Sequence, residues 1–331
     1  MHDLRWFSPN RYCTLPVAGL ERAGLRIATE GDEPAALAFA ADGVSAVAAW
    51  RYAARHRVPL ALYIWDLPPW QVGTGSPNPI IPFRGKLFKV PRPGAYRERS
   101  GYFSRIRFVA QRALDIWAPS DQSRAEIRER FSVGVTEVPF CIDSERFNRA
   151  AGWRPPAGEP TVLAISRLVS YKNHAAVLRA AALVNPKPRV HIVGSGPEAP
   201  ALRQLAGLLG LDLQLDEAWQ TDQQIVEAYL GAHVVVSASR FEGFGLTPLE
   251  ATAMGIPAVA SDIPPHREFA DANTRLVPLD NDHAMAIAIE GAIWSERVGV
   301  LESAKPPVRV TMEACVARMV PKFGELLRGR R

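Results

Sequence analysis

Two glutamates and a glycine-rich turn within residues 234–255 have the residue types and spacing of a binding or catalytic site. Glu242 and Glu250 bracket the turn with seven residues between them. An apolar, β-branched run at 234–236 precedes the turn and predicts a buried parallel strand, and a helix is expected to follow. Backbone N–H groups and the dipole at such a helix start favour anions. Carboxylates beside a phosphate-binding turn suit a ligand that carries sugar hydroxyls next to phosphate.

A simpler role remains open for one of the two glutamates. Thr247 suits the N-cap, Pro248 the first helical position and Glu250 the third, and T-x-x-E is the pattern of a capping box. Glu250 could therefore do no more than close its own helix. That alternative does not account for Glu242 and Gly243, which precede the helix.

Two cations and two further glycines follow other expected strands of the same half. Arg167 and Lys172 come directly after the run 161–165, where Arg can bind a diphosphate as a bidentate fork and Lys as a point charge. The alternative is two surface cations near a helix start. Gly194 and Gly196 follow the run 189–193 and suit a turn whose backbone passes close to a ligand, or simply a tight strand-to-helix turn.

The elements that must position these residues alternate between strand and helix patterns, which predicts a doubly wound, parallel α/β fold. Strands are expected at 4–7, 25–28, 59–65, 115–119 and 135–138, more weakly at 43–48, and then at 161–165, 189–193, 211–215, 234–236, 257–260 and 275–277. Helices in the first half are expected at 15–23, 49–57, 104–114 and 121–131. Residues 71–93 read as a long loop and residues 143–160 as a linker.

Length and composition bound the class of protein. A chain of 331 residues with 47% hydrophobic content predicts two domains of ordinary size. Three cysteines, odd in number and far apart, favour a reducing compartment without disulfides or a zinc site. No signal peptide is visible and no apolar run approaches the roughly 20 residues that span a bilayer, so we expect a cytoplasmic protein, free or at a membrane surface.

Taken together, these motifs resemble family 4 of the retaining GT-B glycosyltransferases, the glycosyl transferases group 1. The E-x7-E segment carries the resemblance, with the G-R-L-x-x-x-K motif at 166–172, where Ser166 replaces the usual glycine, and V-G-x-G-P-x at 193–198. It is strong over 161–279 and weak before residue 58. The resemblance implies two Rossmann-like domains facing across a cleft: an acceptor-side domain, 1–145, to which the last helix, 310–331, crosses back, and a nucleotide-sugar domain, 146–309.

The resemblance also implies roles for individual residues. Glu242 contacts the donor sugar near the anomeric centre, Glu250 binds the ribose hydroxyls, and Arg167 and Lys172 hold the diphosphate. The remaining contacts to the donor fall to Ser166, Gly194, Gly196, Trp219, Gly243, Phe244, Gly245, Leu246 and Thr247. Trp219 lies where the family meets the base, although an indole at that place also suits simple packing.

The first half departs from the family pattern. The glycine pair usual after the first strand is missing, and Asn10 or Arg11 is the candidate polar contact instead. Trp65 stands where many members carry a histidine, which leaves Asp66 as the candidate acceptor-side group, unless it is only a turn residue.

No cofactor is expected beyond the donor itself. His174 and His266 have no neighbouring metal ligands at useful spacing, and the D-x-D at 280–282 reads as the polar start of a helix. We therefore expect no metal requirement.

The expected activity is retaining transfer of a sugar from a nucleotide diphosphate donor to a glycan or lipid-linked acceptor in surface polysaccharide biosynthesis. The expected donor is GDP-mannose. Alternatives are a UDP-sugar-dependent transferase of the same family, a non-catalytic nucleotide-sugar-binding homologue, and an epimerase that acts on the nucleotide sugar itself.

Basic residues concentrate in the first half of the chain. Residues 1–150 carry 21 Lys and Arg against 15 Asp and Glu, and nine of these cations fall within 84–112 beside a single acidic residue, Glu98. Aromatic and aliphatic residues interleave there, as in segments that lie on anionic membrane surfaces. A solvated surface is the alternative, and the absence of a recognisable nucleic-acid-binding motif argues against nucleic acid as a partner.

Overall fold

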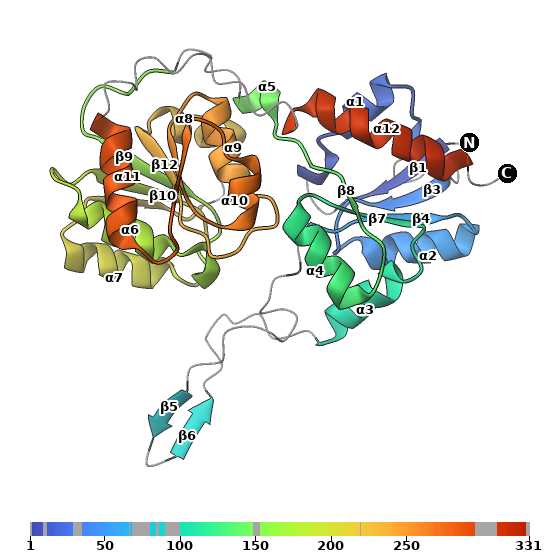
Figure 1. Cartoon of the computed structure of the whole chain (residues 1–331), viewed down its shortest axis with the longest axis horizontal. Helices are drawn as coiled ribbons and strands as arrows, with labels where there is room; N and C mark the ends of the chain where they lie inside the picture. Colours follow the sequence, from blue (N-terminus) through green and yellow to red (C-terminus); the bar gives the residue numbers. More distant parts are fainter. Residues whose placement is uncertain are drawn as a thin grey trace. The chain divides into compact units, whose positions relative to one another are not determined.

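The computed structural model describes residues 2–8, 12–28, 35–65, 67, 80–83, 86–89, 100–147, 153–218, 220–294 and 310–328. The chain divides into two compact units, Met1–Phe140 together with Glu313–Arg331, and Cys141–Met312 (Figure 1). The sequence placed its domain boundaries at 145 and 310.

The first unit contains a six-stranded parallel sheet in the order β2-β1-β3-β4-β7-β8. Its strands are β1 (His2–Phe7), β2 (Ile27–Ala28), β3 (Ala35–Ala40), β4 (Leu60–Tyr63), β7 (Asp115–Ala118) and β8 (Thr136–Glu137). Its helices are η1 (Tyr12–Thr14), α1 (Val17–Arg22), α2 (Ala46–His56), α3 (Ser100–Ala110), α4 (Asp121–Phe131) and the C-terminal α12 (Met312–Arg328). Ser120 caps α4, since its Oγ accepts a hydrogen bond from the Ser123 N–H at 3.2 Å.

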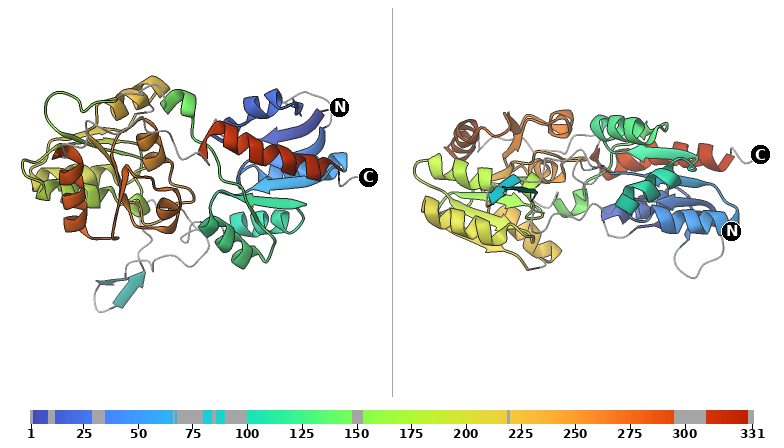
Figure 2. Two further views of the ribbon diagram at one scale, coloured as in Figure 1. Left: turned by 45° about the horizontal axis from the view of Figure 1, so that its top comes forward. Right: turned by 90° about the horizontal axis from the view of Figure 1, so that it is seen from below.

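The C-terminal helix completes the aromatic core of this first unit. Phe323 of α12 is fully buried, and its ring lies 5.0 Å from that of Phe39 and 4.8 Å from that of Trp117. Both views in Figure 2 show α12 along the sheet that begins with β1. A contact between residues nearly 300 positions apart thus fixes the end of the chain to its beginning.

The second unit contains a parallel sheet in the order β11-β10-β9-β12-β13-β14. Its strands are β9 (Thr161–Ile165), β10 (Arg189–Val193), β11 (Leu213–Asp216), β12 (Val234–Ser237), β13 (Ala258–Ser261) and β14 (Thr274–Val277). Its helices are α5 (Ser144–Phe147), η2 (Ser170–Lys172), α6 (His174–Leu183), α7 (Ala199–Leu209), α8 (Asp222–Leu230), α9 (Leu246–Ala253), α10 (Pro264–Phe269) and α11 (Asp282–Trp294). This is the doubly wound Rossmann order, which reverses between β9 and β12.

Four sequence-based assignments were wrong. Residues 43–48 are not a strand: Ala46 begins α2, and the strand of this region is β3, which pairs with both β1 and β4. The alanine-rich β3 favours helix by local propensity, and its two neighbouring strands override that preference. The linker 143–160 contains α5, and the loop 71–93 contains the antiparallel hairpin β5 (Ile80–Phe83) and β6 (Lys86–Lys89). The fourth error concerns the start of α9 (Leu246–Ala253), which begins two residues before Pro248. No helix among the described residues is both long and apolar enough to cross a bilayer.

Two glycines let the turn after β10 pack directly on the turn after β9. A Cβ at Gly194 would lie 1.9 Å from the Ser166 carbonyl oxygen, and one at Gly196 would lie 2.3 Å from that of Leu168. The two turns also share backbone hydrogen bonds, from Leu168 N–H to the Ser195 oxygen at 2.9 Å and from Ser166 N–H to the Val193 oxygen at 3.1 Å. The position of the residues after β9 therefore depends on bare backbone at 194 and 196.

Gly194→Ala should lower the free energy of unfolding by at least about 2 kcal/mol, because the new methyl group overlaps a backbone oxygen that cannot rotate away. The matched control is Gly207→Ala inside α7, where a Cβ meets nothing within 4 Å. The control should gain roughly 0.5–1 kcal/mol from better helix propensity. Urea denaturation of both variants measures the difference, and an unaltered midpoint for Gly194→Ala would contradict the close approach.

Candidate functional site

The candidate site lies at the carboxyl ends of β9 and β12, the neighbouring strands between which the sheet order reverses. Val162 pairs with Val234 and Leu163 with Val235, so the segments that leave these two strands begin side by side. In an open α/β sheet this reversal is the place where ligands bind. Residues 166–172 and 239–245, selected from the sequence for their chemistry, are these two segments.

An ion pair joins the two segments. Lys172 Nζ lies 2.5 Å from Glu242 Oε1, and each side chain is only 14% exposed. Ser239 Oγ donates a second hydrogen bond to the same carboxylate oxygen at 2.7 Å. Burial by itself would raise the pKa of Glu242, but the Lys172 charge and these hydrogen bonds together hold the pKa below its usual value. Glu242 is therefore a carboxylate at neutral pH, with an ammonium group held against it.

Arg167 and Lys172 both lie beside the ring of Tyr171. The Arg167 guanidinium donates to the Tyr171 hydroxyl, and its central carbon lies 5.8 Å from the ring centroid. Lys172 Nζ lies 5.5 Å from the same ring. The two cations predicted from the sequence thus share one short turn, in which the Lys172 side chain is mostly buried and Arg167 is exposed.

A second ion pair, which the sequence reasoning missed, fixes that turn to the glutamate segment. Arg240 donates from its backbone N–H to the Tyr171 oxygen at 2.8 Å, while its guanidinium binds the Asp280 carboxylate at 2.6 Å. Asp280 also accepts from Asn173 Nδ2 at 3.4 Å, and the Arg240 partner lowers the pKa of Asp280. Arg240 stands directly before the glutamate motif, but only the fold reveals its partners.

Helix α9 begins earlier than the sequence pattern indicates. Gly245, with φ +85°, is the N-cap, and no side chain caps this end. Thr247 is therefore the second helical residue, and its Oγ1 donates to the Ile165 oxygen at 3.0 Å. The predicted capping box of Thr247 and Glu250 does not form, because the hydroxyl is engaged by the end of β9. The first-turn N–H groups, including those of Leu246 and Thr247, stay available to an anion.

Glu250 has a partner outside its own helix. It is 5% exposed, and Tyr229 at the end of α8 donates its hydroxyl to Oε2 at 2.7 Å. The helix-closing alternative for Glu250 is therefore wrong. Tyr229 is fully buried and orients the carboxylate from behind.

Two buried histidines lie next to the site residues. His174 Nε2 is 2.9 Å from the hydroxyl of Ser166, the residue that replaces the usual glycine, and burial lowers the pKa of His174 to about 4. His266, 2% exposed, lies 2.8 Å through Nδ1 from the Ser261 carbonyl oxygen, and burial lowers its pKa also. Both rings are neutral at pH 7. Among the described residues, His174 Nδ1 and His266 Nε2 have no hydrogen-bond partner.

The other predicted site residues fall into two groups. Gly194 and Gly196 form the turn that supports Ser166, and Phe244 is buried with its ring 4.4 Å from that of Phe269. Asn10, Asp66 and Trp219 lie outside the described residues. Within the described part of the chain, no group of three or more His, Cys, Asp or Glu side chains is placed to hold a metal ion.

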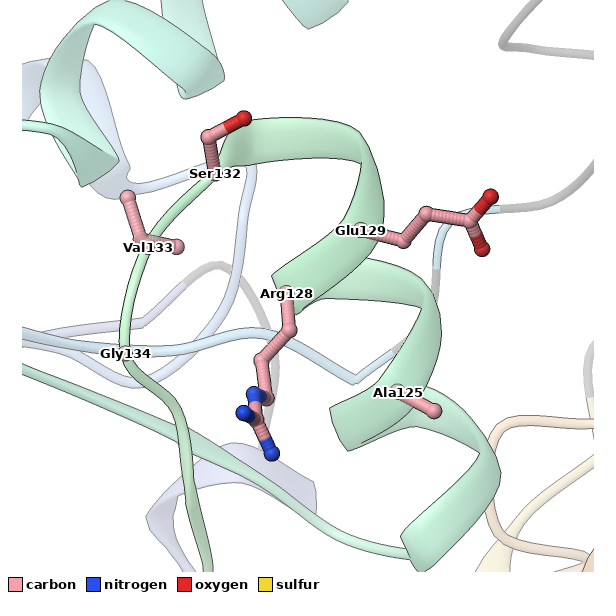
Figure 3. A pocket seen from close by; sticks show the side chains of 6 residues that line it. All are labelled: Ala125, Arg128, Glu129, Ser132, Val133 and Gly134. Carbon is pink, nitrogen blue, oxygen red and sulfur yellow. The ribbon is translucent and has the colours of Figure 1, made fainter.

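The surface hollow in Figure 3 lies elsewhere, in the first unit at the end of α4. It is lined by Ala125, Arg128, Glu129, Ser132, Val133 and Gly134. Figure 3 shows the Arg128 and Glu129 side chains pointing in different directions rather than converging. The hollow offers no constellation comparable to the ion pair at Glu242.

Sequence comparison identifies relatives of known activity class. Residues 146–298 match the family described as glycosyl transferases group 1. The chain is 32% identical over 194 residues to a phosphatidyl-myo-inositol mannosyltransferase of Mycolicibacterium smegmatis, covering 55% of this chain and 48% of that protein. It is 28% identical over 235 residues to a lipopolysaccharide core biosynthesis glycosyltransferase of Rhizobium meliloti, covering 66% of this chain and 62% of that protein. The matched segments thus span about half to three fifths of these relatives.

Solved structures share the fold. HepE of Anabaena, in complex with UDP and glucose, superposes with a TM-score of 0.71 at 15% identity, covering 99% of this chain and 100% of that one. Sucrose-phosphate synthase of Thermosynechococcus elongatus gives 0.70 at 17% identity, covering 95% and 77%. At these identities the likeness establishes architecture alone. Residues 146–298 therefore match the glycosyl transferases group 1 family, and the chain has a GT-B fold with two Rossmann-like units.

Proposed function

We propose that the chain is a retaining glycosyltransferase that moves a sugar from a nucleotide diphosphate donor to a hydroxyl of a glycan or lipid-linked acceptor. The observation that carries the proposal is the Lys172–Glu242 pair, held where the sheet order reverses and beside the uncapped start of α9. Cations, a carboxylate and free N–H groups at one place suit a ligand with both phosphate and hydroxyl groups.

The reaction exchanges one bond at the anomeric carbon for another. The acceptor oxygen bonds to that carbon on the face from which the diphosphate oxygen departs, and the hydroxyl proton passes to the leaving diphosphate. Arg167, Lys172 and the N–H groups at the start of α9 stabilise the negative charge that develops on the diphosphate. Glu242 faces the positive charge on the sugar ring, and Glu250 binds the ribose hydroxyls. These groups need no metal ion.

GDP-mannose remains the preferred donor, with a UDP-sugar as the alternative. The mannosyltransferase of M. smegmatis supports the first choice, and HepE, which binds UDP and glucose, supports the second. The R. meliloti relative in lipopolysaccharide core synthesis supports a role in surface polysaccharide biosynthesis. A non-catalytic binder or an epimerase is the rival, and slow hydrolysis of the donor to free sugar separates a transferase from both.

Binding measurements test the phosphate assignment. A thermal-shift panel of GDP, UDP, ADP and dTDP identifies the nucleotide, since a ligand that binds only the folded state raises the midpoint. With that nucleotide, Arg167→Ala and Lys172→Ala should each weaken binding by roughly 1–3 kcal/mol, the range for charge-assisted hydrogen bonds. Arg189→Ala is the control, because Arg189 is a surface residue at the start of β10 and pairs there with Asp212. If calorimetry finds unchanged nucleotide affinity in both site variants, the assignment of these cations to the diphosphate is wrong.

The two glutamates should separate kinetically. Glu242→Gln removes the charge that faces the sugar, so we expect turnover to fall by at least about a hundredfold with a smaller change in nucleotide affinity. Glu250→Gln should instead weaken nucleotide binding through the ribose. Tyr229→Phe is its control, since it deletes the hydroxyl that orients Glu250 and leaves the carboxylate in place. If Glu250→Gln lowers only the melting temperature, the ribose role is wrong.

We further propose that the basic run 84–112 holds the protein on an anionic membrane at the cytoplasmic face. The described side chains agree with this: Arg105 and Arg107 of α3 are exposed, and Arg112 lies 3.6 Å from the ring centroid of Phe108, itself 41% exposed. A cation beside an exposed aromatic ring is the pairing that membrane interfaces favour.

Liposome sedimentation tests the membrane proposal. The double change Arg105→Glu with Arg107→Glu should weaken binding to anionic vesicles by more than about tenfold, because each cation near the surface contributes about 1 kcal/mol. The same reversals at Arg124 and Arg128 on α4 are the control. Binding should also weaken as salt rises. Equal sedimentation with neutral and anionic vesicles, or none at low salt, would leave the run a solvated surface.

A further inference from the structure

His266 carries a buried hydrogen-bond acceptor for which the described residues provide no donor. Its Nδ1 lies 2.8 Å from the carbonyl oxygen of Ser261, which can only accept, so Nδ1 must carry the ring proton. The Ser261 hydroxyl cannot supply a proton to the ring instead, because it donates to the Ser239 oxygen. In the neutral ring, Nε2 then carries no proton and can only accept a hydrogen bond. Among the described residues it has no hydrogen-bond partner.

This acceptor lies against the turn that bears the candidate site. A Cβ on Gly245, the N-cap of α9, would come within 2.8 Å of His266 Cδ2 and 3.2 Å of Nε2. From the other side, Ser261 contacts Ser239, whose hydroxyl binds Glu242 at 2.7 Å. The ring is thus connected to the ion pair by hydrogen bonds and to the start of α9 by packing.

A purely structural role explains this arrangement poorly. A buried acceptor without a donor is unfavourable, and nearly all such groups in folded proteins find a partner. A phenylalanine would fill the same space behind Gly245 without that cost. Burial also disfavours protonation, so the ring does not become a donor near neutral pH.

The chemistry of a lone pair restricts what could bind there. Phosphate and carboxylate oxygens are themselves acceptors and would be repelled, whereas a hydroxyl group can donate. We infer that His266 is a specificity-determining residue whose Nε2 accepts a hydrogen bond from one hydroxyl of the transferred sugar. This rests on the proposed function. Gly245, the N-cap of α9, lies against this edge of the ring and has no side chain to cover Nε2.

Titration calorimetry with two matched pairs of ligands, GDP and GDP-mannose, and UDP and UDP-glucose, tests the inference. His266→Asn keeps an N–H near the Nδ1 position for Ser261 and removes the Nε2 acceptor. In His266→Asn, the affinity for the nucleotide sugar that the unmodified protein binds should fall roughly five- to tenfold, which corresponds to the loss of one ordinary hydrogen bond. The affinity for the parent nucleoside diphosphate should fall by less than about twofold. His266→Gln, whose amide oxygen reaches towards the Nε2 position, should recover most of the loss.

His233→Asn is the matched control. His233 is also buried, and its Nδ1 accepts from the Thr161 N–H at 3.1 Å, at the opposite edge of the same sheet. An asparagine oxygen can replace that acceptor, so both affinities should stay unchanged.

Deoxy analogues of the bound nucleotide sugar make the test specific. One analogue should bind the unmodified protein more weakly by the same factor and lose nothing further in His266→Asn. If His266→Asn loses affinity equally for the nucleotide sugar and its parent diphosphate, His266 only supports the turn. If both affinities are unchanged, His266 has no role in binding. Either result overturns the inference and leaves the proposed function intact. If the unmodified protein binds none of these four ligands and neither ADP nor dTDP, the proposed function fails and the inference with it.

Discussion

The ion pair between Lys172 and Glu242 is the interaction that joins the two segments of the candidate site in the second unit. Removing two charges from water is costly, and their attraction offsets that cost only with good geometry and further hydrogen bonds. The fold supplies both, through Ser239 at the carboxylate and through Arg240 and Asp280 at the turn that carries Lys172. A hydrophobic pair would give comparable stability, so the charges indicate a site for a polar ligand rather than a device for folding.

Backbone geometry imposes the second constraint. Bare glycine backbone at 194 and 196 lets the turn after β10 support the turn after β9, and Gly245 admits the His266 ring behind the start of α9. In each place a side chain would collide with its neighbour. Because of these glycines, three turns pack together at the carboxyl ends of the strands. The cations, the Glu242 carboxylate and the N-terminus of α9 therefore lie close together there.

The first unit rests on a different kind of constraint, namely apolar packing. Phe39, Trp117 and Phe323 join the sheet to the last helix of the chain. Its described residues bring together no cluster comparable to that around Glu242. The groups on which the proposed function rests, Lys172 and Glu242 among them, therefore all belong to the second unit.

The sequence alone determined the features that depend on neighbours along the chain. Buried parallel strands are continuous apolar runs, so all six strands of the second sheet were predictable, as were the segments after β9 and β12 that carry Arg167, Lys172 and Glu242. The carboxyl ends of parallel strands lie at the same end of the sheet, so the motifs that follow these strands predicted the approximate position of the site.

The tertiary structure decided whatever depends on partners distant in sequence. It paired Ala35–Ala40 with two strands against its helical propensity. It drew the Thr247 hydroxyl to Ile165, which moved the helix start to Leu246, and it gave Glu250 the hydroxyl of Tyr229. It also brought Asp280 to Arg240 and His266 to Gly245. Local propensities and caps are worth about 1 kcal/mol each, and a hydrogen bond or packing contact made across the fold is as strong, so the choice between them is made only when the chain is folded.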